Sequence, residues 1–253
     1  MARYFIDLMY EGTLYKGWQV QPKQPTVQGT IEACLGQLFQ KPVAVTGSGR
    51  TDTGVHAVQQ VAHIDLMQEV TPDQLCHKLN TMLPPDIAVR QIYRVPDDTH
   101  ARFSATQRAY IYQISPSKNA FRHAYAWQMS RSLDLDNMNE AAKYLLGTRD
   151  FKSFSKVKTE VNHFECTIFK AQWERKNDLI AFNVSANRFL RGMVRALVGT
   201  LTEVGLGKMS PQAFEEIIIA QNRKAAGVNA PPQGLFLTQV YYPPELLQYS
   251  EHL

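Results

Sequence analysis

Apolar residues recur along this chain with two periodicities, which predict short strands interrupted by amphipathic helices. From Arg3 to Tyr10, the apolar residues Tyr4, Ile6 and Leu8 share one face, as in a half-buried strand. From Thr26 onward the apolar residues recur instead at helical spacing, and Thr26 is suited to cap that helix. The first 40 residues therefore predict one strand followed by one helix.

The same two periodicities continue to the end of the chain. Further strands are expected at 43–47, 59–66, 88–94, 109–114, 166–175, 179–185 and 234–241. Further helices are expected at 72–79, with Thr71 as the cap, and at 135–146, 189–204 and 211–220. Short connections such as 176–178 favour an α+β fold with a mixed, mostly antiparallel sheet over a doubly wound parallel one. We expect two α+β halves, 1–105 and 106–253.

Composition fits a globular protein. Of the 253 residues, 44% are hydrophobic and 20% charged, which is enough apolar content for a sizeable core. The longest aliphatic run, 217–220, is far too short to span a bilayer, and the N-terminus lacks the apolar region of a signal peptide. The three cysteines form no CxxC pair or even-numbered disulfide set. We therefore expect a cytoplasmic protein with no membrane association.

The net charge of +4 is small, but the basic residues are clustered. Between Arg90 and Arg131 the cations outnumber the acids, Asp97 and Asp98, and aromatic residues lie among them. A second cluster comprises Arg188, Arg191 and Arg195. Basic side chains beside stackable rings are typical of a site for single-stranded or looped RNA. A solvated face over an aromatic core would explain this feature equally well.

The segment 46–57, TGSGRTDTGVHA, is the strongest candidate for a site loop. Three glycines and several hydroxyl residues surround Arg50 and Asp52, directly after a predicted strand. Glycine has no Cβ, so such a loop allows the backbone to approach a ligand closely.

Four interpretations of Asp52 compete. The glycine spacing matches no phosphate-binding motif, and a carboxylate would repel phosphate. An aspartic protease dyad shares one proton between two carboxylates, whereas Arg50 would favour full ionisation of Asp52. A lone ionised carboxylate could act as nucleophile or base on an electrophilic ring. A purely structural Asx turn fits the composition as well.

Several blocks in order resemble one family over nearly the whole chain. They are YKGWQVQP at 15–22, TVQGTIE at 26–32, GSGRTDTGVHA at 47–57, HARFSATQRAYIY at 100–112, FLRGMVRALVGT at 189–200 and APPQGLFL at 230–237. Together they resemble the TruA family of tRNA pseudouridine synthases. The resemblance implies a mixed sheet in each of two similar halves, helices on one side and an active cleft between the halves.

The resemblance also implies a function. It predicts an isomerase that converts uridine to pseudouridine at positions 38, 39 and 40 of the tRNA anticodon stem-loop. The expected partners are tRNA and a second copy of the chain in a homodimer. No metal and no organic cofactor are expected, and the sequence contains no HxxxH or CxxC pattern that would suggest a metal.

Site residues follow by matching the family blocks. Asp52 falls at the position of the catalytic aspartate, and Arg195 at that of its ion-pair partner from the other half. Tyr110 matches the tyrosine expected to stack on the target base, with a further role as a base for the C5 proton left open. Arg50, Arg102 and Arg108 are expected to contact RNA. From residue type alone, Arg195 would be a snorkelling surface arginine and Tyr110 a core tyrosine.

Two positions depart from the family pattern: Arg149, where histidine is more frequent, and Arg191, near which an aromatic residue or histidine is more usual. We expect both to affect tRNA binding rather than chemistry. The alternative function is a catalytically silent tRNA-binding protein that uses the same cleft. A carboxylate beside phosphates weakens binding, so the presence of Asp52 favours the enzyme.

Overall fold

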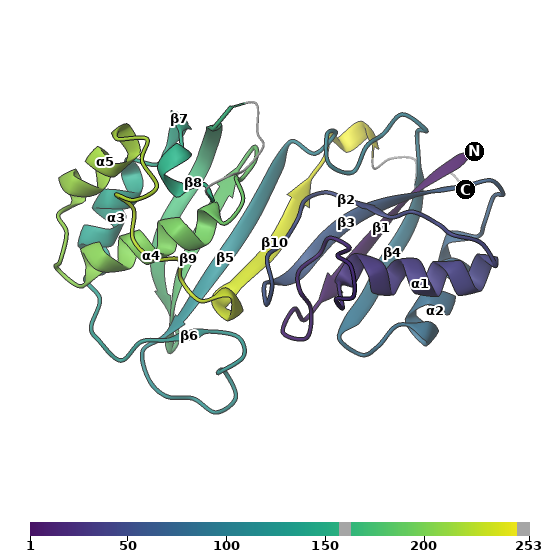
Figure 1. The fold of residues 1–253 in the computed structure, drawn as a ribbon, viewed down its shortest axis with the longest axis horizontal. Coiled ribbons are helices and arrows are strands. Elements are labelled where there is room, and N and C mark those ends of the chain that lie inside the picture. Colours follow the sequence, from purple (N-terminus) through teal and green to yellow (C-terminus); the bar gives the residue numbers. More distant parts are fainter. Residues whose placement is uncertain (157–162, 247–253) are drawn as a thin grey trace. The chain divides into compact units, whose positions relative to one another are not determined.

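The computed structural model describes residues 1–156 and 163–246, and the chain forms two compact units. The first contains Met1–Gln107 together with the C-terminal segment from Leu237, and the second contains Arg108–Phe236. Each unit has its own strands and helices, which Figure 1 colours in chain order.

Antiparallel strands form the framework of the first unit. β1 (Ala2–Tyr10) pairs with β3 (His56–Leu66) on one side and with β4 (Ile87–Val95) on the other. The two-residue β2 (Thr46–Gly47) pairs with β3, and β10 (Leu235–Tyr241) also lies beside β3. The loop between β2 and β3 carries Asp52 and is therefore anchored at both ends to this sheet.

Two helices cover the strands of the first unit on one side (Figure 1). α1 (Val27–Phe39) begins where the Thr26 hydroxyl accepts a hydrogen bond from the Gly29 amide, and it buries Ile31 and Leu35. α2 (Pro72–Met82) packs along β4 and follows Thr71, whose side chain makes no capping bond. Proline at the first helical position suits the start of α2, because the amide it lacks would have no partner in the helix.

The second unit also has a mostly antiparallel sheet. β5 (Gln107–Ser115) pairs with β9 (Leu179–Ala186), β9 with β8 (Glu165–Lys176), and β8 with β7 (Gly147–Asp150), all antiparallel. The short β6 (Trp127–Gln128) pairs in parallel with the end of β5. In the turn between β8 and β9, Asn177 has the positive φ of 54° that a tight hairpin requires.

The helices of the second unit are α3 (Leu135–Lys143), α4 (Met193–Gly205) and α5 (Pro211–Ile219), with short 3₁₀ turns at Lys152–Phe154, Pro232–Gly234 and, in the first unit, Pro244–Leu246. α3 packs on β8 and contacts the other two helices. The buried rings of Phe154 and Phe214 lie 5.8 Å apart between their centres, and Trp173 stacks on Phe182 at 4.7 Å. These rings form the core of the unit.

The α+β class and the mostly antiparallel pairing are confirmed, while several boundaries differ from expectation. The strand expected at 43–47 is reduced to Thr46–Gly47, and β6 and β7 were not predicted. The helix expected from residue 189 begins only at Met193, because Gly192 adopts a φ of +72° that interrupts a helix. β10 joins the first unit, although its position in the chain had suggested the second half. Strand pairing between residues far apart leaves no local pattern.

Within the described ranges, no helix is both long enough and apolar enough to cross a membrane. All three cysteines are free thiols, with Cys34 and Cys166 buried.

Candidate active site

The Asp52 loop is held in shape by its own backbone and by the segment before α1. The Val55 amide donates to the Asp52 carbonyl oxygen at 3.2 Å, and Gly54 turns the chain at a φ of 74°. The Trp18 amide donates to the carbonyl oxygen of Thr51, also at 3.2 Å. Asp52 is half-buried, next to the fully buried Trp18. Its backbone position is therefore fixed from both sides.

Three glycines make this close packing possible. A Cβ on Gly12 would lie 2.1 Å from the Val55 carbonyl oxygen, and one on Gly17 would lie 2.5 Å from that of Thr51. A Cβ on Gly47 would meet the Trp18 ring at 2.6 Å. Each distance is too short for non-bonded atoms. The glycines thus bring two backbone segments together beneath Asp52.

Two hydroxyl residues of the motif, Ser48 and Thr51, make structural hydrogen bonds. Tyr10 and Thr51 share a hydrogen bond between their hydroxyls at 2.8 Å. The buried Gln60 accepts from the Ser48 hydroxyl at 2.5 Å and donates to the Gly49 carbonyl at 3.1 Å. Gln60 was not among the predicted site residues, although a polar residue inside an apolar strand was the signal that could have indicated it.

Arg50 is an exposed residue of this loop. Its Nε donates to Gln19 Oε1 at 3.0 Å, and Gln19 in turn donates to Gln28 on α1 at 2.8 Å. The guanidinium is therefore oriented by a polar chain anchored to α1, on the same unit as Asp52. Such an orientation suits a contact with phosphate.

Arg102 lies in the loop after β4, also in the first unit. Its guanidinium carbon is 5.5 Å from the ring centre of Phe103, which is 75% exposed, and the His100 ring lies 4.4 Å from the same ring. The loop backbone is tied down, since the Ala101 amide donates to His63 Nδ1 at 3.1 Å and the Tyr242 hydroxyl donates to the Ala101 carbonyl at 2.6 Å. His63 supports this loop, as a buried structural histidine would.

His56 has a comparable structural role. It is buried and its Nδ1 accepts from the Gly12 amide at 3.0 Å. The bond ties the start of β3 to the segment that supports the Asp52 loop.

Arg108, Tyr110 and Tyr112 lie on one face of β5 in the second unit, because alternate residues of a strand share a face. Arg108 donates to the Asn187 carbonyl at 2.9 Å. The Tyr110 ring meets Phe189 edge-on, with ring centres 5.1 Å apart. Phe189 can make this contact because it precedes α4 instead of lying within it.

Arg195 belongs to the first turn of α4 and is held near the same face of β5. Its Nε donates to the Ala230 carbonyl at 2.7 Å, and the Ala230 amide donates back to the Arg195 carbonyl at 2.9 Å. The following residue, Pro231, accepts from the Tyr112 hydroxyl at 2.8 Å. Burial raises the pKa of Tyr112, and the charge of Arg195 opposes that rise. The segment 230–234 therefore connects Arg195 to the tyrosine face of β5.

The two departures from the family pattern lie elsewhere in the second unit. Arg149 is on β7 opposite Cys166, and its Nε is buried with no hydrogen-bond partner among the described residues. Arg191 is exposed just before α4, where its carbonyl accepts from the Lys156 amide at 3.0 Å.

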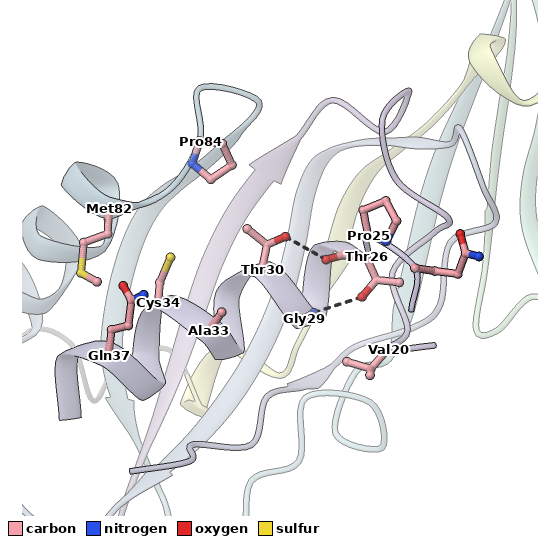
Figure 2. A pocket seen from close by; sticks show the side chains of 11 residues that line it. Val20, Pro25, Thr26, Gly29, Thr30, Ala33, Cys34, Gln37, Met82 and Pro84 are labelled. Atoms are coloured by element: carbon pink, nitrogen blue, oxygen red, sulfur yellow. Dashed lines mark hydrogen bonds between the residues drawn. The ribbon is translucent and has the colours of Figure 1, made fainter. Parts of the chain in front are cut away.

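A pocket of about 530 Å³ lies elsewhere, beside α1 (Figure 2). Its lining is mostly small or apolar, including Gly29, Ala33, Cys34, Met82 and Pro84, and it contains none of the predicted site residues. The part of the chain that the structure describes holds no group of three His, Cys, Asp or Glu residues arranged for a metal ion. Shape alone would thus have pointed away from Asp52.

Comparison with known proteins identifies the family of this chain. A family model described as tRNA pseudouridine synthase matches residues 8–104 and 141–243. The tRNA pseudouridine synthase A of Parabacteroides distasonis is 46% identical over 253 residues, which cover 99% of this chain and 100% of the relative. The proteins of that name from Bacteroides fragilis (46% over 250 residues; 98% and 99% covered) and Bacillus subtilis (41% over 239 residues; 93% and 97% covered) are similar over most of their lengths. The resemblance noted in the sequence is confirmed, and the chain belongs to the tRNA pseudouridine synthase family.

Proposed function

We propose that this protein isomerises uridine to pseudouridine at positions 38, 39 and 40 of the tRNA anticodon stem-loop, with the Asp52 carboxylate as its catalytic group. The observation that supports the proposal is the fixed backbone of the loop that contains Asp52. Backbone hydrogen bonds and close contacts at glycines fix the backbone of the half-buried Asp52 in its loop. A group held in this way loses little entropy in reaching its reactive geometry.

The reaction breaks the N1–C1′ bond of uridine, turns the uracil ring and joins C5 to C1′. The proton on C5 is released as N1 gains one, so atoms and electrons balance without redox chemistry. Asp52 acts in this sequence either by adding covalently to the base or sugar, or by taking the C2′ proton. In both roles it must be ionised.

The second unit supplies the other groups. Arg195 forms the ion pair that keeps Asp52 charged and oriented, and its bond to Ala230 restricts the guanidinium to one approach. Tyr110 stacks on the target uracil and is a candidate base for the C5 proton, with Phe189 against its ring edge. The proposal requires both residues to act on the same nucleotide as Asp52.

Arg50, Arg102 and Arg108 contact the RNA backbone around the reacting nucleotide. Their orientations are set by Gln19, by the Phe103 ring and by the Asn187 carbonyl, respectively. We further propose that the protein works as a homodimer in the cytoplasm and needs no metal or organic cofactor.

The test is release of tritium from tRNA labelled at uridine C5, without added metal or nucleotide. The intact protein should release tritium. Asp52→Ala should release none, while it binds tRNA about as tightly as the intact protein. Asp52→Asn is the matched control for shape, and it should also be inactive because it keeps the volume and loses the charge.

Two outcomes would contradict the proposal. Release by Asp52→Ala at the normal rate would remove the carboxylate from the chemistry. Tight binding of tRNA with no release by the intact protein would instead identify the chain as the silent tRNA-binding protein.

A further inference from the structure

The polar chain that orients Arg50 extends further along α1 than Gln28. Arg50 Nε donates to Gln19 Oε1 at 3.0 Å, and Gln19 Nε2 donates to Gln28 Oε1 at 2.8 Å. Gln28 Nε2 donates in turn to Glu32 Oε1 at 2.9 Å, one helical turn further along α1. The polar chain therefore comprises Gln19, Gln28 and Glu32, and it ends on a carboxylate.

Two backbone groups fix the orientation of the Gln28 carboxamide. The Val20 amide, which can only donate, lies 3.1 Å from Gln28 Oε1, and the Val45 carbonyl, which can only accept, lies 3.0 Å from Gln28 Nε2. A flipped carboxamide would place donor against donor and acceptor against acceptor. Gln19 must therefore use its Nε2 to donate to Gln28, which leaves its Oε1 as the acceptor for Arg50.

Glu32 fixes the other end of the polar chain. Its Oε1 accepts from Gln28 Nε2 at 2.9 Å and from the Val45 amide at 3.0 Å. Gln28 and Glu32 are four residues apart on α1, so their side chains are neighbours on one face of the helix. The polar chain is thus attached both to α1 and to the segment that leads into β2.

Arg50 uses only one of its three guanidinium nitrogens in this arrangement. Nε is bonded to Gln19, whereas Nη1 and Nη2 have no hydrogen-bond or ion-pair partner among the residues that the structure describes. These two nitrogens carry the remaining N–H donors of a planar fork. A phosphate can accept two parallel hydrogen bonds from such a fork.

We propose that Gln28 and Glu32 are positioning residues, which hold Arg50 so that Nη1 and Nη2 donate two parallel hydrogen bonds to one phosphate of the tRNA. A freely rotating arginine would lose conformational entropy on binding, and part of this loss is avoided when Nε is already bonded. This inference rests on the proposed function, because it takes tRNA as the substrate.

The experiment exchanges amide and carboxylate, which changes the hydrogen bonding and keeps the volume of the side chain. Gln28→Glu loses the Nε2 donor and places a carboxylate against the Val45 carbonyl and Glu32. Glu32→Gln is the conservative variant, since its Oε1 can still accept from both partners. Gln37→Glu is the matched control, because it adds the same charge at an exposed position of α1 outside the polar chain.

Fluorescence anisotropy measures the Kd of each variant for a full-length tRNA transcript over a range of salt concentrations. Gln28→Glu should raise the Kd about fivefold and lower the salt dependence by up to about one phosphate contact. Glu32→Gln and Gln37→Glu should each change the Kd by less than about twofold.

The same substitution in the Arg50→Ala protein separates positioning from a general structural role. Arg50→Ala alone should raise the Kd about tenfold. Adding Gln28→Glu should then have no effect beyond that of adding Gln37→Glu, because the group that Gln28 positions is already absent.

An equal rise in Kd for Gln28→Glu and Gln37→Glu would mean that the added charge alone weakens binding. A comparable rise for Gln28→Glu in the Arg50→Ala protein would mean that Gln28 supports the fold and not Arg50. Either result would overturn the inference. Failure of the proposed function would look different, because the intact protein would then bind tRNA and release no tritium.

Discussion

At the scale of single residues, the glycines of the Asp52 region differ in importance although they look alike in sequence. Gly17 lies against Thr51 and has a φ of 93°, whereas a Cβ on Gly49 would meet nothing within 4 Å. The density of glycines around Asp52 was enough to identify the loop. Which glycine carries a close contact depends on the second segment, and that is visible only in the fold.

Gly17→Ala should therefore lower kcat for tritium release at least tenfold by displacing the loop that holds Asp52. The matched variant Gly49→Ala should keep nearly normal activity, because its added methyl group points into open space. Tritium release at saturating tRNA measures both. Equal activity of the two variants would show that the close contact at Gly17 does not position Asp52.

Arg195 and Arg191 offer a second residue-level comparison. Arg195→Ala should lower kcat strongly, since the variant loses the charge proposed to face Asp52. Arg195→Lys should restore only part of the activity, because lysine has neither the Nε–H that donates to Ala230 nor the planar guanidinium fork. Arg191→Ala, which removes an exposed arginine outside the proposed ion pair, should change KM more than kcat. A normal rate for Arg195→Ala would exclude it from the site.

At the scale of elements, the two threonines expected to cap helices behave differently. Both Thr26 and Thr71 precede apolar residues at helical spacing, so the sequence pattern did not distinguish them. In the fold, the Thr26 side chain accepts from the Gly29 amide, and that of Thr71 makes no such bond. Helix positions were thus predictable from periodicity, whereas cap geometry was not.

Thr26→Ala should lower the free energy of unfolding by about 1 kcal/mol, because it removes the side-chain acceptor of a part-buried amide in the first turn of the helix. Thr71→Ala should lower the free energy of unfolding by only a few tenths of that amount. Urea denaturation followed by circular dichroism measures both values. A larger loss for Thr71→Ala would mean that capping does not decide the difference.

Element boundaries were the weaker part of the sequence prediction. The start of α4 was placed too early because Phe189 and Leu190 continue the apolar pattern, while Gly192 ends it through its backbone conformation. This error concerned the site directly. Because Phe189 lies outside the helix, its ring packs against that of Tyr110 instead of forming part of a helix face.

At the scale of the whole molecule, the stability of the fold should depend on pH through His63. This ring is 6% exposed, and burial together with the nearby charge of Arg3 lowers its pKa to about 4 from 6.5. Below pH 6.5 His63 is protonated in the unfolded chain, whereas in the folded chain it stays neutral until the pH falls to about 4. The free energy of unfolding should therefore fall as the pH drops through this window, by up to about 1.4 kcal/mol per pH unit.

His63→Asn is the matched variant, since Asn Oδ1 can accept from the Ala101 amide in place of Nδ1 and does not titrate. Urea denaturation at pH 7 and pH 5 should give a smaller loss of stability for His63→Asn than for the intact protein. The pKa of His100 is also lowered by burial, so part of the dependence should remain. Identical losses in both proteins would rule out His63 as the source.

The path of the chain between the two units has a consequence for how the protein is made. The first unit contains both the beginning of the chain and β10, so the second unit is an insertion joined to it by two connections, near residues 107 and 237. During synthesis, β3 emerges from the ribosome about 170 residues before β10, its neighbour on the side away from β1. The second unit, although translated later, is complete first. The unit that carries the aspartate therefore closes last, and any message cut short before β10 yields a chain in which β3 is an exposed edge of the first unit's sheet.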